Sequence, residues 1–217
     1  MTMMLVVDVS GSRLFGSEER TKKNIITEIA AVLAFSAAQN NDKVGCIFFS
    51  DKVEKFIPPK KGKSHVLMII RELIGFEPKS QRTCLSEPIR FLTNVNKKRC
   101  TTFVLSDFMD PASDREGLND ALKIAGGKHD IVAIRVTDPR EAELPDVGLM
   151  KVRDTETGHE QYIDTSSKAL RRAHREWWID RQEQMRVCFT KSRVDSVSVR
   201  TDEDYVKALM TLFARRS

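Results

Sequence analysis

The sequence predicts a three-layer α/β fold, in which a mainly parallel, doubly wound sheet carries helices on both faces. Short apolar runs, typical of strands buried on both faces, recur along the chain. Segments with helical apolar spacing alternate with these runs from Met3 to Val136, as in consecutive βαβ units. The composition, 41% hydrophobic and 31% charged over 217 residues, is that of a globular chain with a substantial core.

Apolar runs predict the strands of the sheet. They are Met3–Val7, Val44–Phe49, Thr102–Leu105, Ile131–Val136 and Asp195–Val199. A further strand, Val53–Ile57, is expected after a tight turn at Ser50–Lys52. Pro58–Pro59 should close this strand, and prolines favour a place at the edge of a sheet.

Helices are predicted where apolar side chains recur on one face. The segment Glu18–Gln39 contains so few polar residues in its second half that we expect it to be heavily buried. The other predicted helices are one capped by Ser64 that runs through Leu73, Leu85–Val95, one through Leu118–Ala125 stopped by Gly126–Gly127, Ser167–Phe189, and a last one capped by Thr201 or Asp202 that runs through Leu212.

The simplest domain organisation is a single domain over residues 1–217. Gly148–Val152 and Gln161–Ile163, joined by a turn at Asp154–Gly158, predict a hairpin. Together with the helix Ser167–Phe189, this hairpin forms an elaboration at about residues 145–190. In that helix Trp177 and Trp178 are adjacent, so at most one of them can face the core fully.

Charge and cysteine content narrow the class of protein. A net charge of +5, from 36 basic and 31 acidic side chains, is weak evidence for nucleic-acid binding, and no basic-aromatic run supports it. The four cysteines form no Cys-x-x-Cys pair and lie at no zinc-ligand spacing. We therefore expect four free thiols in a reducing compartment.

The N-terminus predicts a cytoplasmic protein. Asp8 interrupts the first apolar run, which excludes a signal peptide, and no stretch of about 18 apolar residues is present, so this chain has no membrane segment. A core strand that starts at Met3 suggests that the native polypeptide extends further upstream.

The most informative motif is Asp8-Val9-Ser10-Gly11-Ser12, between a predicted buried strand and a long helix. In open α/β sheets, ligands bind beyond the carboxyl ends of the strands. A carboxylate followed by hydroxyls at alternate positions suits a hard cation such as Mg²⁺. Gly11 should let the backbone turn tightly enough to direct both hydroxyls at one point.

Two further polar residues are expected at the same edge. Thr83 lies in a loop just before a helix, and Asp107 follows the strand Thr102–Leu105. Asp-x-Ser-x-Ser, then Thr, then Asp is the three-loop pattern of a metal-ion-dependent adhesion site, which binds a protein partner through its cation. Asp110 competes with Asp107 for its role, but a turn with Pro111 suits it better. Serines and aspartates also cap helices, so the motif alone is weak evidence.

The sequence argues against an enzyme. The serines of the motif have no evident base, because the histidines lie outside the three loops; they are His65, His129, His159 and His174. Neither a Gly-x-Ser-x-Gly elbow nor a P-loop ending occurs. An aspartyl-phosphatase would need a carboxylate in place of Ser10. A metal-assisted phosphate-ester hydrolase stays the alternative function, and a nucleic-acid binder is a weaker rival.

Several strings resemble the von Willebrand factor A-like part of the bacterial "domain of unknown function 58" family. They are Val7-Asp8-Val9-Ser10-Gly11-Ser12, Phe49-Ser50-Asp51-Lys52-Val53-Glu54, Pro58-Pro59-Lys60-Lys61-Gly62, Leu105-Ser106-Asp107-Phe108, Arg135-Val136-Thr137-Asp138-Pro139-Arg140-Glu141, Leu144-Pro145-Asp146-Val147-Gly148 and Ser198-Val199-Arg200-Thr201-Asp202-Glu203-Asp204-Tyr205. The resemblance covers nearly the whole chain, and the strings are specific in combination.

The resemblance implies a partnership with MoxR-type AAA+ ATPases that act in assembly or metal loading of other proteins. It also implies a segment before the first strand. An Mg²⁺ or Mn²⁺ centre is expected, with Ser10, Ser12 and Thr83 as direct ligands and with Asp8 and Asp107 bound directly or through water. An open coordination position would take a carboxylate from the ATPase or its client. Two departures are Arg13, where methionine is common, and Cys84, where aspartate is common.

Overall fold

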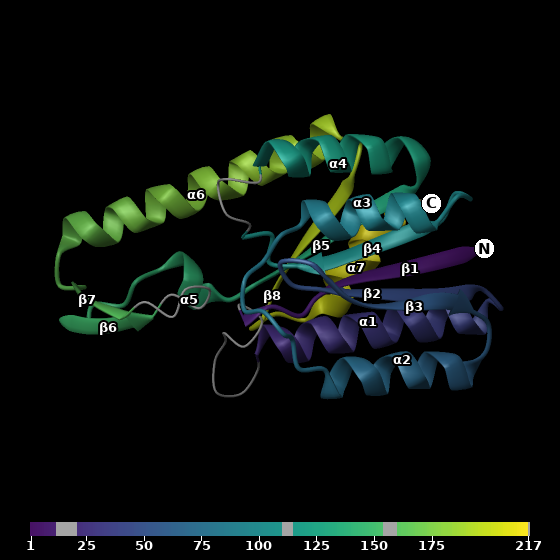
Figure 1. The fold of residues 1–217 in the computed structure, drawn as a ribbon. Helices are drawn as coiled ribbons and strands as arrows, with labels where there is room; N and C mark the ends of the chain where they lie inside the picture. The colour runs from purple at the N-terminus through teal and green to yellow at the C-terminus, as the bar shows by residue number, and fades with distance from the viewer. Residues whose placement is uncertain (12–20, 110–114, 154–159, 217) are drawn as a thin grey trace.

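The computed structural model describes residues 1–11, 21–109, 115–153 and 160–216. Its main sheet has the order β3-β2-β1-β4-β5-β8 (Figure 1). The strands are β1 (Thr2–Asp8), β2 (Lys43–Phe49), β3 (Val53–Lys60), β4 (Thr101–Ser106), β5 (Asp130–Thr137) and β8 (Asp195–Arg200). Only the β2–β3 pair is antiparallel among these neighbours. The five strands predicted for one sheet are therefore confirmed in it.

Helices cover both faces of the sheet, which confirms the predicted three layers. They are α1 (Lys22–Gln39), α2 (Lys63–Gly75), α3 (Ser86–Val95), α4 (Arg115–Lys128), α6 (Lys168–Lys191) and α7 (Tyr205–Ala214). The short helix α5 (Pro139–Ala142) buries none of its residues. Alternate residues of β1 point to opposite faces: Leu5 and Val7 pack with α1, α2 and α7, whereas Met4 and Val6 pack with α3, α4 and α6. The central strand is therefore buried on both sides.

Two predicted element ends are wrong, and packing explains both. Strand β3 continues through Pro58–Pro59 to Lys60, because an edge strand does not need every N–H for pairing. Helix α4 continues through Gly126–Gly127 to Lys128. A Cβ at Gly126 would lie 2.6 Å from the carbonyl oxygen of Ser192, so this glycine permits a close approach to the end of α6 rather than ending a helix.

Two predicted helix starts also differ. Ser64 makes no cap, since α2 begins at Lys63 without a side-chain cap hydrogen bond. Helix α7 is capped by Asp204, whose Oδ1 accepts from the N–H of Val206 at 2.9 Å, rather than by Thr201 or Asp202. Thr201 instead donates from Oγ1 to Asp138. The predicted first residues of α1, 18–20, lie outside the described residues.

An arm, defined here as β6 (Leu149–Arg153), β7 (Glu160–Asp164) and α6, extends from the main sheet (Figure 1). Strands β6 and β7 pair with each other in a separate two-stranded sheet, as the hairpin prediction requires. Thr165 anchors its base: Oγ1 donates to the carbonyl of Gly148 at 2.7 Å. The predicted turn at Asp154–Gly158 lies outside the described residues.

Two other sequence expectations are met. All four cysteines are free thiols. In α6 Trp178 is 8% exposed, whereas its neighbour Trp177 is 50% exposed, so only one of the pair faces the core. Within the described ranges, none of the helices is both long and apolar enough to traverse a lipid bilayer.

Candidate functional site

The carboxyl ends of the central strands bring the predicted site residues together. Asp8 is the last residue of β1, and Asp107 directly follows β4. These two strands are parallel neighbours, with Val7 paired to Leu105, so their ends lie at the same edge of the sheet (Figure 1). We call the polar group at this edge the strand-end cluster. It consists of Asp8, Ser10, Thr83, Ser106 and Asp107, all of which are buried.

Neutral hydrogen-bond donors hold the carboxylate of Asp8. Its Oδ1 accepts from the backbone N–H of Ser10 at 2.9 Å, and its Oδ2 accepts from the hydroxyl of Ser106 at 2.6 Å. The same hydroxyl oxygen of Ser106 accepts from the N–H of Phe108 at 3.0 Å. The start of the loop after β1 is thus tied to the end of β4.

Thr83 joins the cluster from the loop before α3. Its Oγ1 donates to the Oγ of Ser10 at 2.9 Å, across 73 residues of sequence. The next residue, Cys84, donates from its N–H to the carbonyl of Ser50 at 2.9 Å, which fastens the loop to the end of β2. Carboxylate and hydroxyl oxygens from separate segments therefore meet in one buried place.

Gly11 lies against a neighbouring loop, and its predicted role in directing both hydroxyls involves Ser12, which lies outside the described residues. The φ of Gly11 is not in the left-handed region, where Gly62 and Gly148 lie among the described glycines. Its N–H donates to the carbonyl of Gln81 at 3.1 Å, and an added Cβ would lie 2.3 Å from the Oε1 of Gln81. The glycine therefore gives room for the loop that carries Thr83.

A buried lysine holds the second carboxylate. The Nζ of Lys22, in the first turn of α1, lies 2.6 Å from Asp107 Oδ2 and 2.5 Å from Glu141 Oε1 of α5. The other oxygen of Asp107, Oδ1, accepts from the N–H of Met109 at 3.0 Å. Lys22 is 1% exposed, so this ammonium is removed from water and depends on its carboxylate partners.

The electrostatic surroundings of Asp8 favour its protonated form. Burial, and next the charge of Asp107, raise the pKa of Asp8 to about 6, although the hydrogen bonds from Ser106 and Ser10 oppose the rise. A carboxylate in this position is stabilised by any additional positive charge. The cluster therefore favours either a proton or a cation near Asp8.

The pKa values of Lys22 and Glu141 are shifted by burial and by each other's charge. Burial alone would lower the pKa of Lys22, but the charges of Asp107 and Glu141 outweigh it and the pKa is raised. Burial raises the pKa of Glu141, and the charge of Lys22 opposes that rise. Lys22 is therefore a permanent cation beside the cluster at neutral pH.

Arg135 of β5 links the cluster to the arm. Its Nε donates to the carbonyl oxygen of Asp107 at 3.1 Å, and its Nη1 donates to Gln182 of α6. The guanidinium carbon lies 5.6 Å from the ring centroid of Trp178. Burial lowers the pKa of Arg135 to about 10, so the side chain stays charged at neutral pH.

The structure thus brings together Asp8, Ser10, Thr83 and Asp107 of the predicted set. Ser12 and the competing Asp110 lie outside the described residues. Among the described residues, no three His, Cys, Asp or Glu side chains gather as a metal site. A cation here would therefore depend on hydroxyl oxygens as well as carboxylates, and both are ligand types that Mg²⁺ accepts.

Sequence reasoning missed Ser106, Lys22 and Glu141 as parts of this region. Parallel pairing of β1 with β4 places Ser106 next to Asp8, so a register argument could have found it. Nothing in the sequence distinguishes Lys22 from the adjacent Lys23. Glu141 meets Lys22 across 119 residues, and its side chain also accepts from the N–H of Asp138 in the capping box of α5.

Imidazoles of the described histidines contact groups outside the cluster. His65 meets the carbonyl of Val44, His129 meets the thiol of Cys100, and His174 meets the carbonyl of Glu141. None of these contacts places an imidazole on a hydroxyl of the cluster, and a general base needs that geometry.

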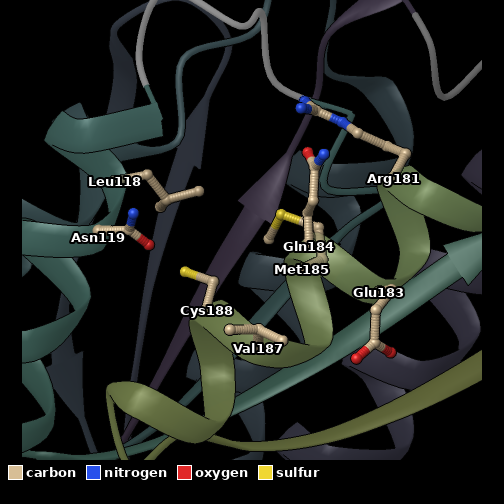
Figure 2. A pocket seen from close by; sticks show the side chains of 8 residues that line it. All are labelled: Leu118, Asn119, Arg181, Glu183, Gln184, Met185, Val187 and Cys188. Carbon is tan, nitrogen blue, oxygen red and sulfur yellow. The ribbon is translucent and has the colours of Figure 1, made fainter.

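A cavity of about 310 Å³ lies elsewhere, between α4 and α6 (Figure 2). Leu118 and Asn119 face it from α4, and Met185 and Cys188 from α6. Its walls are mainly apolar, and Glu183 at its rim pairs with Arg186 on the surface. This cavity lacks the oxygen-rich lining of the strand-end cluster.

Solved structures with low sequence identity share the fold. BatB, a conserved hypothetical protein from Bacteroides thetaiotaomicron, is 18% identical with a TM-score of 0.64, over 99% of this chain and 97% of that one. An aerotolerance-related membrane protein from Bacteroides fragilis is 16% identical with a TM-score of 0.65, over 98% and 96%. The VWA domain of SpRpn10 is 12% identical with a TM-score of 0.52, over 99% and 94%. The fold is therefore of the von Willebrand factor A type.

Curated relatives come from mycobacteria. An uncharacterized protein of Mycobacterium tuberculosis is 27% identical over 220 residues, which is 98% of this chain and 66% of that protein. One of Mycobacterium avium is 27% identical over 169 residues, 74% of this chain and 93% of that protein. The chain thus spans 66% of the length of the M. tuberculosis relative. The family described as "Protein of unknown function DUF58" matches residues 1–184, so the chain belongs to that family.

Proposed function

We propose that this chain is a protein-interaction module that binds its partner through a divalent cation, Mg²⁺ or Mn²⁺, at the strand-end cluster. Ser10, Ser12 and Thr83 would ligate directly, and Asp8 and Asp107 directly or through water. One coordination position would stay open for a carboxylate of the partner.

The observation that carries this proposal is the convergence of Asp8, Ser10, Thr83 and Asp107 on one buried edge. The donors are all oxygens, from two carboxylates and two hydroxyls, which is the chemistry that hard cations prefer. Mutual repulsion of Asp8 and Asp107 helps to raise the pKa of Asp8, and a cation between them would relieve it. The residues present therefore fit the cation.

A protein partner suits this site better than a substrate. A cation bound mainly by neutral hydroxyls keeps enough positive charge to attract a further carboxylate. The von Willebrand factor A fold supports a protein partner. A MoxR-type AAA+ ATPase or its client is the partner that the sequence resemblance implies. The reaction would then belong to the ATPase, and this chain would supply recognition.

Asp8→Ala tests the proposal most directly. We expect the variant to lose binding of Mn²⁺ and Mg²⁺ by calorimetry, and to lose chelator-sensitive capture of the MoxR-type ATPase from the same organism. The loss should exceed the 10- to 100-fold typical of changes one shell away from a metal. Asp130→Ala is the control, since Asp130 begins β5, at the opposite end of the strands from the cluster, where it pairs with Arg216.

Equal cation and partner binding by the wild type and Asp8→Ala would show that the cluster is only a polar turn. The same preparations should be incubated with phosphate esters and Mn²⁺. Turnover that disappears in Asp8→Ala but persists in Asp130→Ala would replace the proposal with the metal-assisted hydrolase.

A further inference from the structure

We propose that Lys22 is an internal counter-cation of the strand-end cluster, which competes with the divalent cation for Asp107 and so sets the cation affinity. The inference rests on the proposed function, because it assumes that the cation binds at this cluster. It assigns control of the cation affinity to Lys22, a residue that is not itself one of the proposed ligands.

Geometry gives the first reason. The ammonium of Lys22 lies 2.6 Å from Asp107 Oδ2, while Asp107 Oδ1 accepts from the N–H of Met109. Both oxygens of this carboxylate are therefore engaged. A divalent cation that approaches Asp107 meets a positive charge already in contact with it, and the two cations repel each other at short range in a poorly screened place.

The asymmetry between the two aspartates gives the second reason. Asp8 is held by the N–H of Ser10 and the hydroxyl of Ser106, which are neutral donors. Asp107 is held by a full positive charge. Of the described side chains, none that the hydrogen bonds place on Asp8 is a cation, whereas the attraction of a divalent cation to Asp107 is offset by Lys22.

Glu141 makes the exchange possible. If a cation takes Asp107, the buried ammonium of Lys22 still has the Glu141 carboxylate at 2.5 Å. Glu141 is itself fixed, because its other oxygen accepts from the N–H of Asp138 at 2.9 Å. Lys22 can therefore yield Asp107 to a cation without becoming an unpaired buried charge, which would be prohibitive.

The decisive variant is the charge-balanced double substitution Lys22→Met with Glu141→Gln. It removes one positive and one negative charge, so the net charge is unchanged and Asp107 is left without its ammonium. We expect the full chain with this double substitution to bind Mn²⁺ at least about tenfold more tightly than the wild type by calorimetry. An effect of net charge alone would leave the affinity unchanged.

The single variant Glu141→Gln tests the opposite direction. Lys22 would then depend more on Asp107 and give it up less readily, so Mn²⁺ should bind at least about tenfold more weakly. Glu143→Gln is the control. It removes the same charge only two residues along the chain, but from an exposed side chain, which pairs with Arg175. Glu143→Gln should leave the affinity near that of the wild type.

The outcomes separate this inference from the proposed function. If the wild type binds Mn²⁺, and the double variant Lys22→Met/Glu141→Gln and the single variant Glu141→Gln each bind it with the affinity of the wild type, the inference is overturned. The cation site then still stands. If the wild type binds poorly and the double variant binds well, Lys22 masks the site, as inferred. If none of the proteins binds Mn²⁺, both proposals fail. Should the double variant not fold, an unchanged affinity in Glu141→Gln still overturns the inference.

Discussion

The strand-end cluster and the arm contain ion pairs of the same length in opposite surroundings. Lys22 and Asp107 lie 2.6 Å apart with side chains that are 1% and 3% exposed. Lys151 and Glu160, across the β6–β7 hairpin, also lie 2.6 Å apart but are 49% and 47% exposed. Water screens the second pair and not the first, so burial rather than distance decides what each pair contributes.

The strand-end cluster buries polar groups, whereas the arm exposes large apolar side chains. In the strand-end cluster, buried carboxylates and hydroxyls satisfy each other through hydrogen bonds. In the arm, Leu149, Tyr162 and Trp177 are exposed, and the hairpin is a two-stranded sheet of its own. An isolated hairpin is marginally stable. Substitutions should therefore have large effects at the cluster and small ones at the exposed side chains of the arm.

The largest expected effect comes from Lys22→Met, measured as the free energy of unfolding by urea in the presence of chelator. Removal of one partner of a buried ion pair leaves charged carboxylates without compensation, and we expect a loss of about 4 kcal/mol. Lys151→Met, which breaks the exposed pair in the arm, should cost less than about 1 kcal/mol. Similar losses in the two variants would contradict the comparison.

The adjacent tryptophans of α6 test the effect of burial within one helix, because Trp178 is buried and Trp177 is exposed. Trp178→Ala should lower the free energy of unfolding by about 3 kcal/mol, because the ring is buried against the sheet and under Arg135. Trp177→Ala should cost less than about 1 kcal/mol, since half of that side chain already faces water. Thermal and urea unfolding of both variants measure the difference. A larger loss for Trp177→Ala would mean that the arm packs against another surface in solution.

Asp8→Asn should stabilise the cation-free protein at neutral pH. The folded-state pKa of Asp8 is about 6, against 3.8 for the ordinary group, so the native state binds this proton more tightly than the unfolded state does. The wild type therefore loses stability as the pH rises from about 4 to about 6, by up to about 3 kcal/mol from this group. The neutral amide avoids that loss.

Urea unfolding in chelator at several pH values measures this effect. The amide does not reproduce every hydrogen bond of the carboxyl group, so the variant should be slightly less stable than the wild type near pH 4 and more stable by about 2 kcal/mol at pH 7.5. A difference that is the same at both pH values would show that burial and the charge of Asp107 do not control Asp8.

The smallest effect concerns the base of the arm. Thr165→Val removes a buried hydroxyl that donates to the carbonyl of Gly148 and accepts from the N–H of Val147. We expect a loss of about 1 kcal/mol and faster hydrogen exchange in β6 and β7. Ser166→Ala, at the exposed neighbouring position, is the control. Unchanged exchange in the hairpin of Thr165→Val would show that this hydroxyl does not hold the arm.

Local patterns in the sequence were sufficient for much of the fold. The apolar runs predicted the inner strands β1, β2, β4 and β5, because a strand buried on both faces needs apolar residues at nearly every position. The edge strands β3 and β8 are mostly half-buried or exposed. Element ends were less predictable. Pro58–Pro59 and Gly126–Gly127 usually interrupt structure, but an edge position and a close packing contact allow β3 and α4 to continue through them.

The sequence by itself determined which strand ends would carry Asp8 and Asp107, because polar residues directly after buried strands can be found from the chain alone. Only the tertiary structure decided that Lys22 and Glu141, 119 residues apart, would meet beside Asp107. It also decided which of two adjacent tryptophans is buried. The physical reason is that periodicity is a local property, whereas the partner of a buried charge depends on how distant elements pack.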